Sequence, residues 1–152
     1  ERNLLLHDGI ATFMVQAGDV VAIERQVTMY QTNRWGMPDP SYLDVNTPAT
    51  LGYIRYATRA RILQKYPRHK LASDGTRYGA GQAIVTPSVI RGELLALYRE
   101  LEEAGIVENF DQYKADLIVE RNANDRNRVD VLAPPDLVNQ FRIFAMKTMY
   151  VL

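Results

Sequence analysis

The sequence predicts an α+β fold in which two main helices pack on one face of a mixed or antiparallel sheet. Three observations lead to this prediction: a hairpin pattern near the start, two helix-start signals in the middle, and a second hairpin pattern near the end. The expected order of elements is β-β-α-α-β-β-β. A chain of 152 residues with 47% apolar and 24% charged residues is expected to fold as a single globular domain, residues 1–152.

The first hairpin is predicted from "GIATFMVQAGDVVAIERQVTMYQTN". Residues 11–16 are rich in strand formers, Gly18 and Asp19 supply the turn, and residues 20–30 alternate between apolar and polar positions. One face of the second strand is mostly apolar and the other is more polar. We therefore expect a sheet with one packed side.

Two Thr-Pro pairs mark the starts of the two main helices. Thr47 and Pro48 are typical of a first helical turn, and this helix should run to about Tyr66, because Pro67 disfavours helical geometry in the residue before it. The loop before this helix, "NRWGMPDPSYLDVN", is rich in Pro, Gly, Asp and Asn. The connection after it, "KLASDGTRYGAGQA", is rich in Gly.

The second helix is predicted to begin at Thr86 and Pro87 and to stop at Gly105. An apolar stripe at helical spacing supports it. The stripe comprises Ile90, Leu94, Leu97, Tyr98 and Leu101. Residues 109–117 are expected to make one or two further helical turns. "LIVER" and "RVDVLA", joined by the turn-rich "NANDRN", then predict a second hairpin.

The chain ends on "NQFRIFAMKTMYVL", after a Pro-Pro break at residues 134–135. As a strand, residues 141–152 would be largely apolar on both faces and would run roughly 40 Å, about twice the usual length. A strand of this kind needs cover on both sides. Part of it is therefore expected to be covered from outside the domain. The alternatives are an ordinary internal strand, or a helix with Phe141, Phe144, Ala145 and Thr148 on one face.

The formal net charge is zero, which argues against a general nucleic-acid binder. The charges are nevertheless segregated into a basic segment, 55–70, and an acidic segment, 93–120. The basic residues are Arg55, Arg59, Arg61, Lys65, Arg68 and Lys70. The acidic residues are Glu93, Glu100, Glu102, Glu103, Glu108, Asp111, Asp116 and Glu120. Such a pattern can set the orientation of a self-associating subunit, or it can simply mark two solvated helix faces.

The sequence offers no catalytic, cofactor-binding or metal-binding residues that we would single out. It has no cysteine, and His7 and His69 lack partners at ligand or hydrogen-bond spacing. Trp35 is expected either to pack over its own loop or to anchor an interface. No apolar run reaches 18 residues, so no membrane span and no membrane partner are expected. The chain begins at Glu1, which suggests a fragment or processed form.

The ordered succession of several segments resembles the C-terminal part of Mu-like contractile-phage tail sheath proteins. These segments are "GDVVAIERQVTMYQTN", "GMPDPSYLDVNTPATLGYIRYATRARI", "KYPRHKLASDG" and "GIVENFDQYKADLIVERNANDRNRVDVLAPPDLVNQFRIFA". The resemblance runs from about Gly9 to Leu152, although no single motif in it is diagnostic. It implies that residues 1–152 are the C-terminal, tube-proximal core domain of a longer sheath subunit.

Such subunits stack in helical rings around a tail tube and contract to drive the tube through the host envelope. The resemblance implies a structural virion protein, not an enzyme, that needs no cofactor and assembles in the bacterial host cytoplasm. Its partners would be other copies of itself, the tube protein, and the baseplate and tail terminator proteins. A tail-tube or baseplate adaptor is the alternative, and a small-ligand-binding domain or hydrolase is a more distant one.

Related sheaths link neighbouring subunits through exchanged terminal arms, which add strands to each other's sheets. We therefore expect residues 141–146 to join the domain's own sheet and the last six residues to be donated to a neighbour. The donated residues would be Lys147, Thr148, Met149, Tyr150, Val151 and Leu152. The candidates for charged contacts between subunits or with the tube are Arg55, Arg59, Lys65, Arg68, Lys70, Glu100, Glu102 and Glu103.

Overall fold

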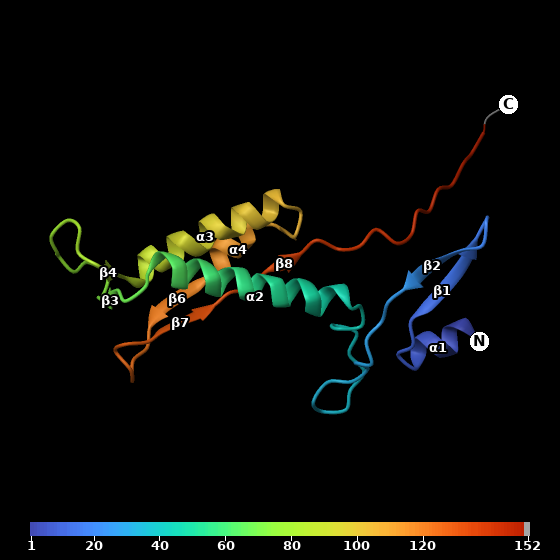
Figure 1. Cartoon of the computed structure of the whole chain (residues 1–152), viewed down its shortest axis with the longest axis horizontal. Helices are drawn as coiled ribbons and strands as arrows, with labels where there is room; N and C mark the ends of the chain where they lie inside the picture. The colour runs from blue at the N-terminus through green and yellow to red at the C-terminus, as the bar shows by residue number, and fades with distance from the viewer. Residues whose placement is uncertain (151–152) are drawn as a thin grey trace. The chain divides into compact units, whose positions relative to one another are not determined.

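A computed structural model describes residues 1–150; Val151 and Leu152 lie outside the described part. The chain forms two compact units, Glu1–Lys65 and Tyr66–Leu152, and each is described by itself. The described residues contain four helices and several short, mainly antiparallel sheets (Figure 1). The α+β class predicted from the sequence is confirmed.

Over residues 1–150 the strands form four two-stranded sheets, whereas the sequence predicted one sheet. Three of the pairs are antiparallel: β1 with β2, β5 with β8, and β6 with β7. The fourth pair, β3 (Lys70–Leu71) with β4 (Ile84–Val85), is parallel. Four of the eight strands are only two residues long, so each can pair with one neighbour over two positions and cannot extend a larger sheet.

The first unit begins with α1 (Arg2–His7) and the predicted hairpin of β1 (Thr12–Gln16) and β2 (Val20–Arg25). Gly18 and Asp19 form its turn, both with a positive φ (84° and 57°), as a tight hairpin turn requires. The second strand was expected to run to residue 30 but ends at Arg25. Beyond it the backbone turns to another partner, because the N–H of Thr28 donates to the carbonyl of Leu43 at 2.7 Å.

The first main helix, α2, spans Asn46–Lys65. It ends before Pro67, as predicted, and its start at Asn46 lies within one residue of the predicted cap.

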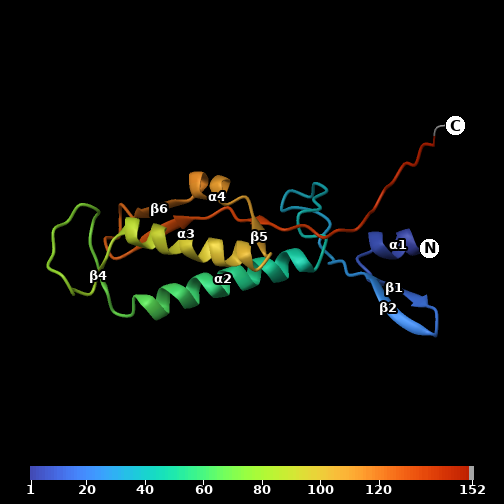
Figure 2. The ribbon, with the colours of Figure 1, turned by 90° about the horizontal axis from the view of Figure 1, so that it is seen from above.

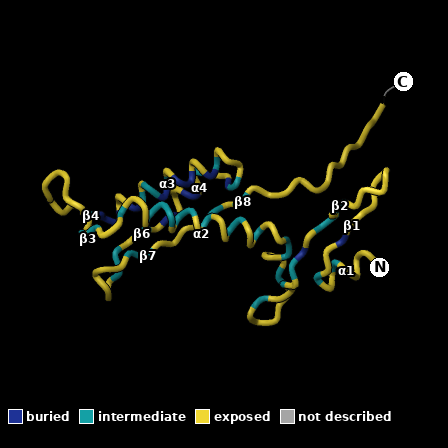
Figure 3. The backbone as a smooth tube through the Cα atoms, viewed as in Figure 1, coloured by how far each residue is buried: buried dark blue, intermediate teal, exposed yellow. Residues whose placement is uncertain are grey.

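The second unit is organised around α3 (Pro87–Glu103), the second predicted main helix. Its predicted apolar stripe is buried, as the dark blue tube in Figure 3 shows. The stripe packs against β6 and β5 and against α4 (Phe110–Asp116). Both views show α3, α4 and β6 close together (Figures 1 and 2). Gly105, with φ 69°, follows the end of α3, where the sequence placed the stop.

The start of α3 is held by a residue that the sequence did not reveal. Thr86 is the N-cap and Pro87 the first helical residue, as predicted, but the Thr86 side chain makes no capping bond. The carboxylate of Asp74, in the preceding loop, accepts instead from the backbone N–H of Ser88 at 3.1 Å and from its hydroxyl at 2.5 Å. Asp74 thereby satisfies one of the free N–H groups of the first turn.

The second hairpin is also confirmed, with β6 (Ile118–Arg121) pairing antiparallel to β7 (Val129–Leu132). The connection between them is a tight turn held by Asn122, whose side-chain oxygen accepts from the N–H groups of Asn124 and Asp125 at 2.8 Å each. This is an Asx-type turn, in which the side chain replaces a backbone acceptor.

The last strand in the described part of the chain is β8 (Asp136–Leu137), which pairs with β5 (Val107–Glu108). After it, residues 138–150 form neither strand nor helix (Figure 1). The expectation that residues 141–146 join the domain's own sheet is therefore wrong, and so are the internal strand and the helix considered as alternatives.

Candidate functional site

The most unusual surface of the second unit is its terminal segment, residues 139–150, which we call the arm. Every residue of the arm is exposed (Figure 3). Its six large apolar side chains are between 74% and 83% exposed: Phe141, Ile143, Phe144, Met146, Met149 and Tyr150. Isolated exposed apolar residues are ordinary, whereas several of them close together in one segment are typical of a surface that binds a partner.

The predicted donated residues lie at the end of this arm. Lys147, Thr148, Met149 and Tyr150 are all exposed and take part in no strand. Val151 and Leu152 lie outside the described residues. The exposed segment thus contains the predicted residues that the structure describes and begins earlier, at residue 139. Their donation to a neighbour stays a prediction.

The β1–β2 hairpin carries a second exposed apolar surface, on its own unit. Its register places Phe13 opposite Ile23 and Val15 opposite Val21, so these four side chains share one face. They are between 61% and 66% exposed. On the opposite face Thr12 is buried, and its hydroxyl donates to Glu24, which also pairs with Arg2 of α1. The opposite face is thus covered at its Thr12 end only, because Met14 and Val20 farther along it are exposed.

The basic segment is distributed over both units. Arg55, Arg59 and Lys65 are exposed on α2, and the first two lie one helical turn apart and so share a face. Arg68 and Lys70 are exposed in the second unit. The structure thus places these five side chains in solvent, on two separate units.

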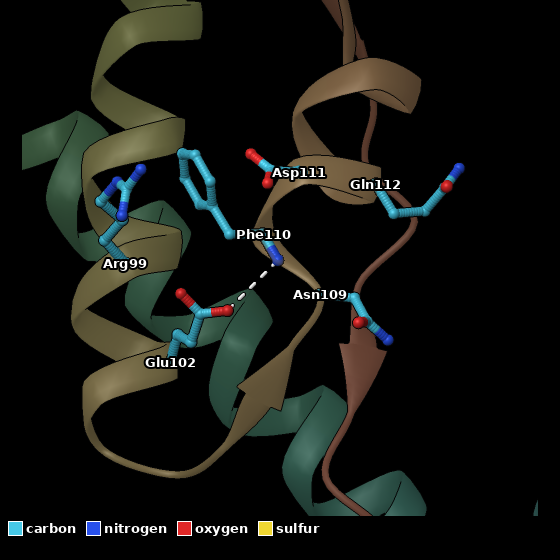
Figure 4. Close-up of a pocket in the computed structure, with 6 residues that line it drawn as sticks. All are labelled: Arg99, Glu102, Asn109, Phe110, Asp111 and Gln112. Atoms are coloured by element: carbon cyan, nitrogen blue, oxygen red, sulfur yellow. Dashed lines mark hydrogen bonds between the residues drawn. The ribbon is translucent and has the colours of Figure 1, made fainter.

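The acidic candidates on α3 divide into two kinds. Glu100 and Glu103 are exposed, whereas Glu102 is half-buried and accepts from the backbone N–H of Phe110 at 3.2 Å, as the dashed line in Figure 4 shows. Glu102 therefore holds the start of α4 within the same chain. Beside it, the guanidinium of Arg99 lies 3.8 Å from the centroid of the Phe110 ring.

These side chains line an open depression of about 400 Å³ between the end of α3 and the start of α4 (Figure 4). Its lining is Arg99, Glu102, Asn109, Phe110, Asp111 and Gln112. In Figure 4 the side chain of Gln112 points away from Glu102 and the Asp111 carboxylate lies beside the Phe110 ring, so the two carboxylates do not converge on a common point. The depression is a junction of two helices, and it does not present the clustered acids of a hydrolytic site.

The two histidines also have local partners. The ring of His69 packs edge-on against Tyr66, with centroids 5.4 Å apart, and its Nδ1 lies 3.2 Å from the carbonyl oxygen of Pro67. The backbone carbonyl of His7 accepts from the side chain of Gln31. Over residues 1–150, no three His, Cys, Asp or Glu side chains are grouped closely enough to hold a metal ion. A search of the same residues finds no helix with the length and apolar character to cross a membrane.

Trp35 does not pack over its own loop. Its side chain is 71% exposed and carries the guanidinium of Arg34 at 4.1 Å from its ring centroid. The loop beneath is ordered, because the side-chain oxygen of Asn33 accepts from the N–H groups of Trp35 and Met37 at 3.0 and 3.1 Å. Of the two expectations for Trp35, packing on its own loop is thus wrong.

Two tyrosines form the centre of the second unit, and the sequence singled out only one of them, as part of an apolar stripe. Tyr98 and Tyr113 stack with centroids 3.7 Å apart and planes inclined by 12°. Burial raises the pKa of Tyr98, and burial followed by the proximity of Tyr98 raises the pKa of Tyr113 to about 12. Both hydroxyls therefore stay protonated at neutral pH.

Comparison with known proteins identifies the class to which this fold belongs. The family model for the phage tail sheath C-terminal domain matches residues 37–150, which is most of the chain. The chain therefore belongs to the phage tail sheath C-terminal domain family, and the resemblance found in the sequence is confirmed.

A curated relative agrees with this assignment. The chain is 57% identical over all of its 152 residues to a Mu-like prophage FluMu tail sheath protein of Haemophilus influenzae (strain ATCC 51907 / DSM 11121 / KW20 / Rd). The match covers 31% of that protein, so the chain spans about a third of the length of this relative.

Proposed function

We propose that residues 1–152 act as the C-terminal, tube-proximal domain of a tail sheath subunit that polymerises in helical rings and contracts. The observation that carries the proposal is the arm: in a member of the sheath family, a run of apolar residues is exposed and unpaired within its own chain. An arm of this kind is stabilised when it binds a neighbouring copy, because burial of its side chains removes apolar surface from water.

The arm is donated as a strand to the β1–β2 hairpin of a neighbouring subunit. A hairpin of two strands has two open edges, and an added strand satisfies the N–H and C=O groups at one of them. Two-stranded sheets are marginally stable in water, so the hairpin is stabilised by the same addition. The residues that supply the end of this strand are Lys147, Thr148, Met149, Tyr150, Val151 and Leu152.

A donated strand suits a contractile assembly, because the segment between the donated strand and its own domain can change direction while the strand stays bound to the neighbour. Neighbouring subunits thereby stay linked while the spacing of the rings changes. The exposed charges would then set register between subunits or against the tube, since exposed ion pairs contribute only about 0–1 kcal/mol each. The exposed charged candidates are Arg55, Arg59, Lys65, Arg68, Lys70, Glu100 and Glu103.

The remaining parts of the proposal follow from the same assignment. The partners are other sheath subunits, the tail tube protein, and the baseplate and tail terminator proteins, and the assembled protein resides in the virion after assembly in the bacterial cytoplasm. The domain acts as a structural element without catalysis and without a cofactor, and it binds neither nucleic acid nor membrane.

Disulfide trapping tests the donated strand directly, because the chain contains no cysteine of its own. Met149→Cys is combined with Val15→Cys or Val21→Cys in the longer sheath subunit, and the assembled particles are oxidised. We expect chains of covalently linked subunits in gels run without reductant. The matched control is Met149→Cys with Val131→Cys, which places the second thiol on the other hairpin, β6–β7.

Ladders of linked subunits from the β1–β2 pairs, and only dimers or monomers from the control, support donation to this hairpin. Donation to this hairpin is contradicted if the control pair gives as much crosslinked product as the β1–β2 pairs. It is also contradicted if neither β1–β2 pair forms a crosslink in assembled particles. Assembly itself, seen as tubular sheaths by electron microscopy, tests the sheath function independently of where the arm binds.

A further inference from the structure

The arm leaves the second unit at a single short strand. β8 comprises only Asp136 and Leu137, which pair with Glu108 and Val107 of β5. The N–H of Val138 donates to the carbonyl of Ile106 at 3.2 Å, and no strand follows in the described part of the chain. A force applied to the arm by a neighbouring subunit is therefore transmitted to the domain through Asp136, Leu137 and Val138.

A ladder of two residue pairs is too short to resist such a pull by itself. A side chain from α3 reinforces it: the hydroxyl of Tyr98 donates to the carbonyl of Glu108 at 2.6 Å and accepts from the N–H of Asp136 at 3.2 Å. One hydroxyl group thus binds the backbone of both strands. The side chain of Asn109 adds a bond to the Asp136 carboxylate at 2.5 Å.

The tyrosine that carries this hydroxyl is fixed in place. Tyr98 is 2% exposed and lies on a helix whose neighbouring stripe residues are also buried. Its ring is stacked on Tyr113 and packs at a tilt against Phe110, with centroids 6.2 Å apart. Because the ring cannot shift without opening this packing, the hydroxyl is a fixed point to which β8 is attached.

We infer that Tyr98 anchors the C-terminal arm: its hydroxyl holds β8 against β5 and so fixes the point at which the arm leaves the domain. The inference rests on the proposed function, in which the arm links subunits. The attachment of β8 determines how many residues of the arm are free to span the distance to the neighbouring subunit. If residues 136–138 detached, the arm would lengthen by roughly 10 Å, at about 3.3 Å per residue, and neighbouring subunits would be held more loosely.

Hydrogen exchange on the 152-residue chain tests the anchor without any need for assembly. Tyr98→Phe keeps the ring and removes the hydroxyl, and we expect exchange at the N–H groups of Asp136 and Val138 to rise roughly tenfold. The amides of α3 should keep their rates. Tyr113→Phe is the matched control, because it removes a hydroxyl from the same ring stack.

A second variant tests the same strand from the other side. Asn109 has a positive φ of 59°, so Asn109→Gly removes its side chain without backbone strain. This change should also raise exchange at Asp136 selectively. Unchanged exchange at β8 in Tyr98→Phe overturns the inference, and so does an equal rise in Tyr113→Phe or a rise that extends evenly over α3.

The two proposals fail in different experiments. Selective opening of β8 in Tyr98→Phe together with failed disulfide trapping would leave the anchor standing and reject donation to the hairpin. Successful trapping with no effect of Tyr98→Phe on β8 would keep the donated strand and reject the anchor.

Discussion

Two apolar stretches of the second unit, the stripe of α3 and the arm, have opposite surroundings. On α3, Leu94 is 3% exposed and Leu101 is 5% exposed, whereas Phe144 of the arm is 75% exposed. Both stretches are rich in large apolar side chains, at helical spacing on α3 and at irregular spacing on the arm. The helix stripe finds β5, β6 and α4 within the same unit, while the arm follows a two-residue strand and finds no such surface.

The difference shows that apolar patterning predicts burial but not the molecule that provides it. A stripe flanked by elements that can return to it is buried by its own chain. The arm follows a Pro-Pro break, and all of its described residues are exposed. In the proposed function, its cover comes from a neighbouring copy of the chain.

The largest expected change in the free energy of unfolding comes from a substitution in the buried stripe of α3. Leu94→Ala should lower the free energy of unfolding of the chain by about 2–5 kcal/mol, because it removes a buried side chain and leaves a cavity. Chemical denaturation followed by circular dichroism measures the change. Phe144→Ala, which truncates a larger side chain on the arm, should change the same quantity by less than about 0.5 kcal/mol. Comparable losses in both variants would mean that the arm is buried in its own chain.

A smaller effect is expected at the start of α3. Asp74→Ala removes the carboxylate that accepts from Ser88, so the variant should be less stable than the natural chain at neutral pH, though by less than Leu94→Ala. The bond to the Ser88 hydroxyl, foremost, lowers the pKa of Asp74 below its usual 3.8.

The pH dependence of this cap has a definite sign. A lowered pKa in the folded state means that the stabilisation is complete above pH 3.8 and is lost as the pH falls through the lowered value. The stability difference between the two proteins should therefore shrink on acidification. Thermal unfolding at a series of pH values checks this, with Ser73→Ala as a neighbouring control. A difference that is independent of pH would contradict the assigned role.

The tyrosine stack should give a loss of stability at alkaline pH. The pKa of Tyr113 is raised from 10.0 to about 12, so the folded state favours the protonated hydroxyl. The stabilisation is complete below pH 10 and is lost as the pH rises through about 12. Absorbance titration at alkaline pH should show this tyrosine ionising late. Tyr113→Phe should reduce the amplitude of the late step and leave the share of Tyr98, whose pKa burial also raises. An unchanged titration in that variant would contradict the assignment.

The smallest expected change in the stability of the chain comes from removing the arm. Deletion of residues 139–152, the arm together with the two residues after it, should leave the stability of the chain within about 0.5 kcal/mol, since every described residue of the arm is exposed. The same deletion in the longer subunit should prevent stable assembly. A large loss of stability in the isolated chain would show that the arm packs on its own domain.

The main elements could be predicted from the sequence because their signals are local. Turn residues at Gly18 and Asp19, a Thr-Pro start at residue 86 and the stripe through Leu94 each act over a few residues, and both hairpins and both long helices are found there. The four two-residue strands could not be predicted, because pairs as short as these depend on tertiary contacts rather than on alternation.

The candidate site was predictable in part. The exposed apolar end followed from its composition and its position after Pro134 and Pro135, whereas the extent of the arm did not, because the short β8 is invisible to periodicity. Asp74 and Asn109 were missed for the same reason. Each bonds to a residue at least 14 positions away, Ser88 and Asp136 respectively, and no local pattern marks such a pair.

The most direct test of the central claim is hydrogen exchange of residues 141–150, measured in the isolated chain and in assembled sheaths of the longer subunit. We predict rapid exchange in the isolated chain and strong protection after assembly, because the arm gains strand hydrogen bonds from a neighbour. Strong protection already in the isolated chain, or rapid exchange that persists in assembled sheaths, would contradict donation of the arm.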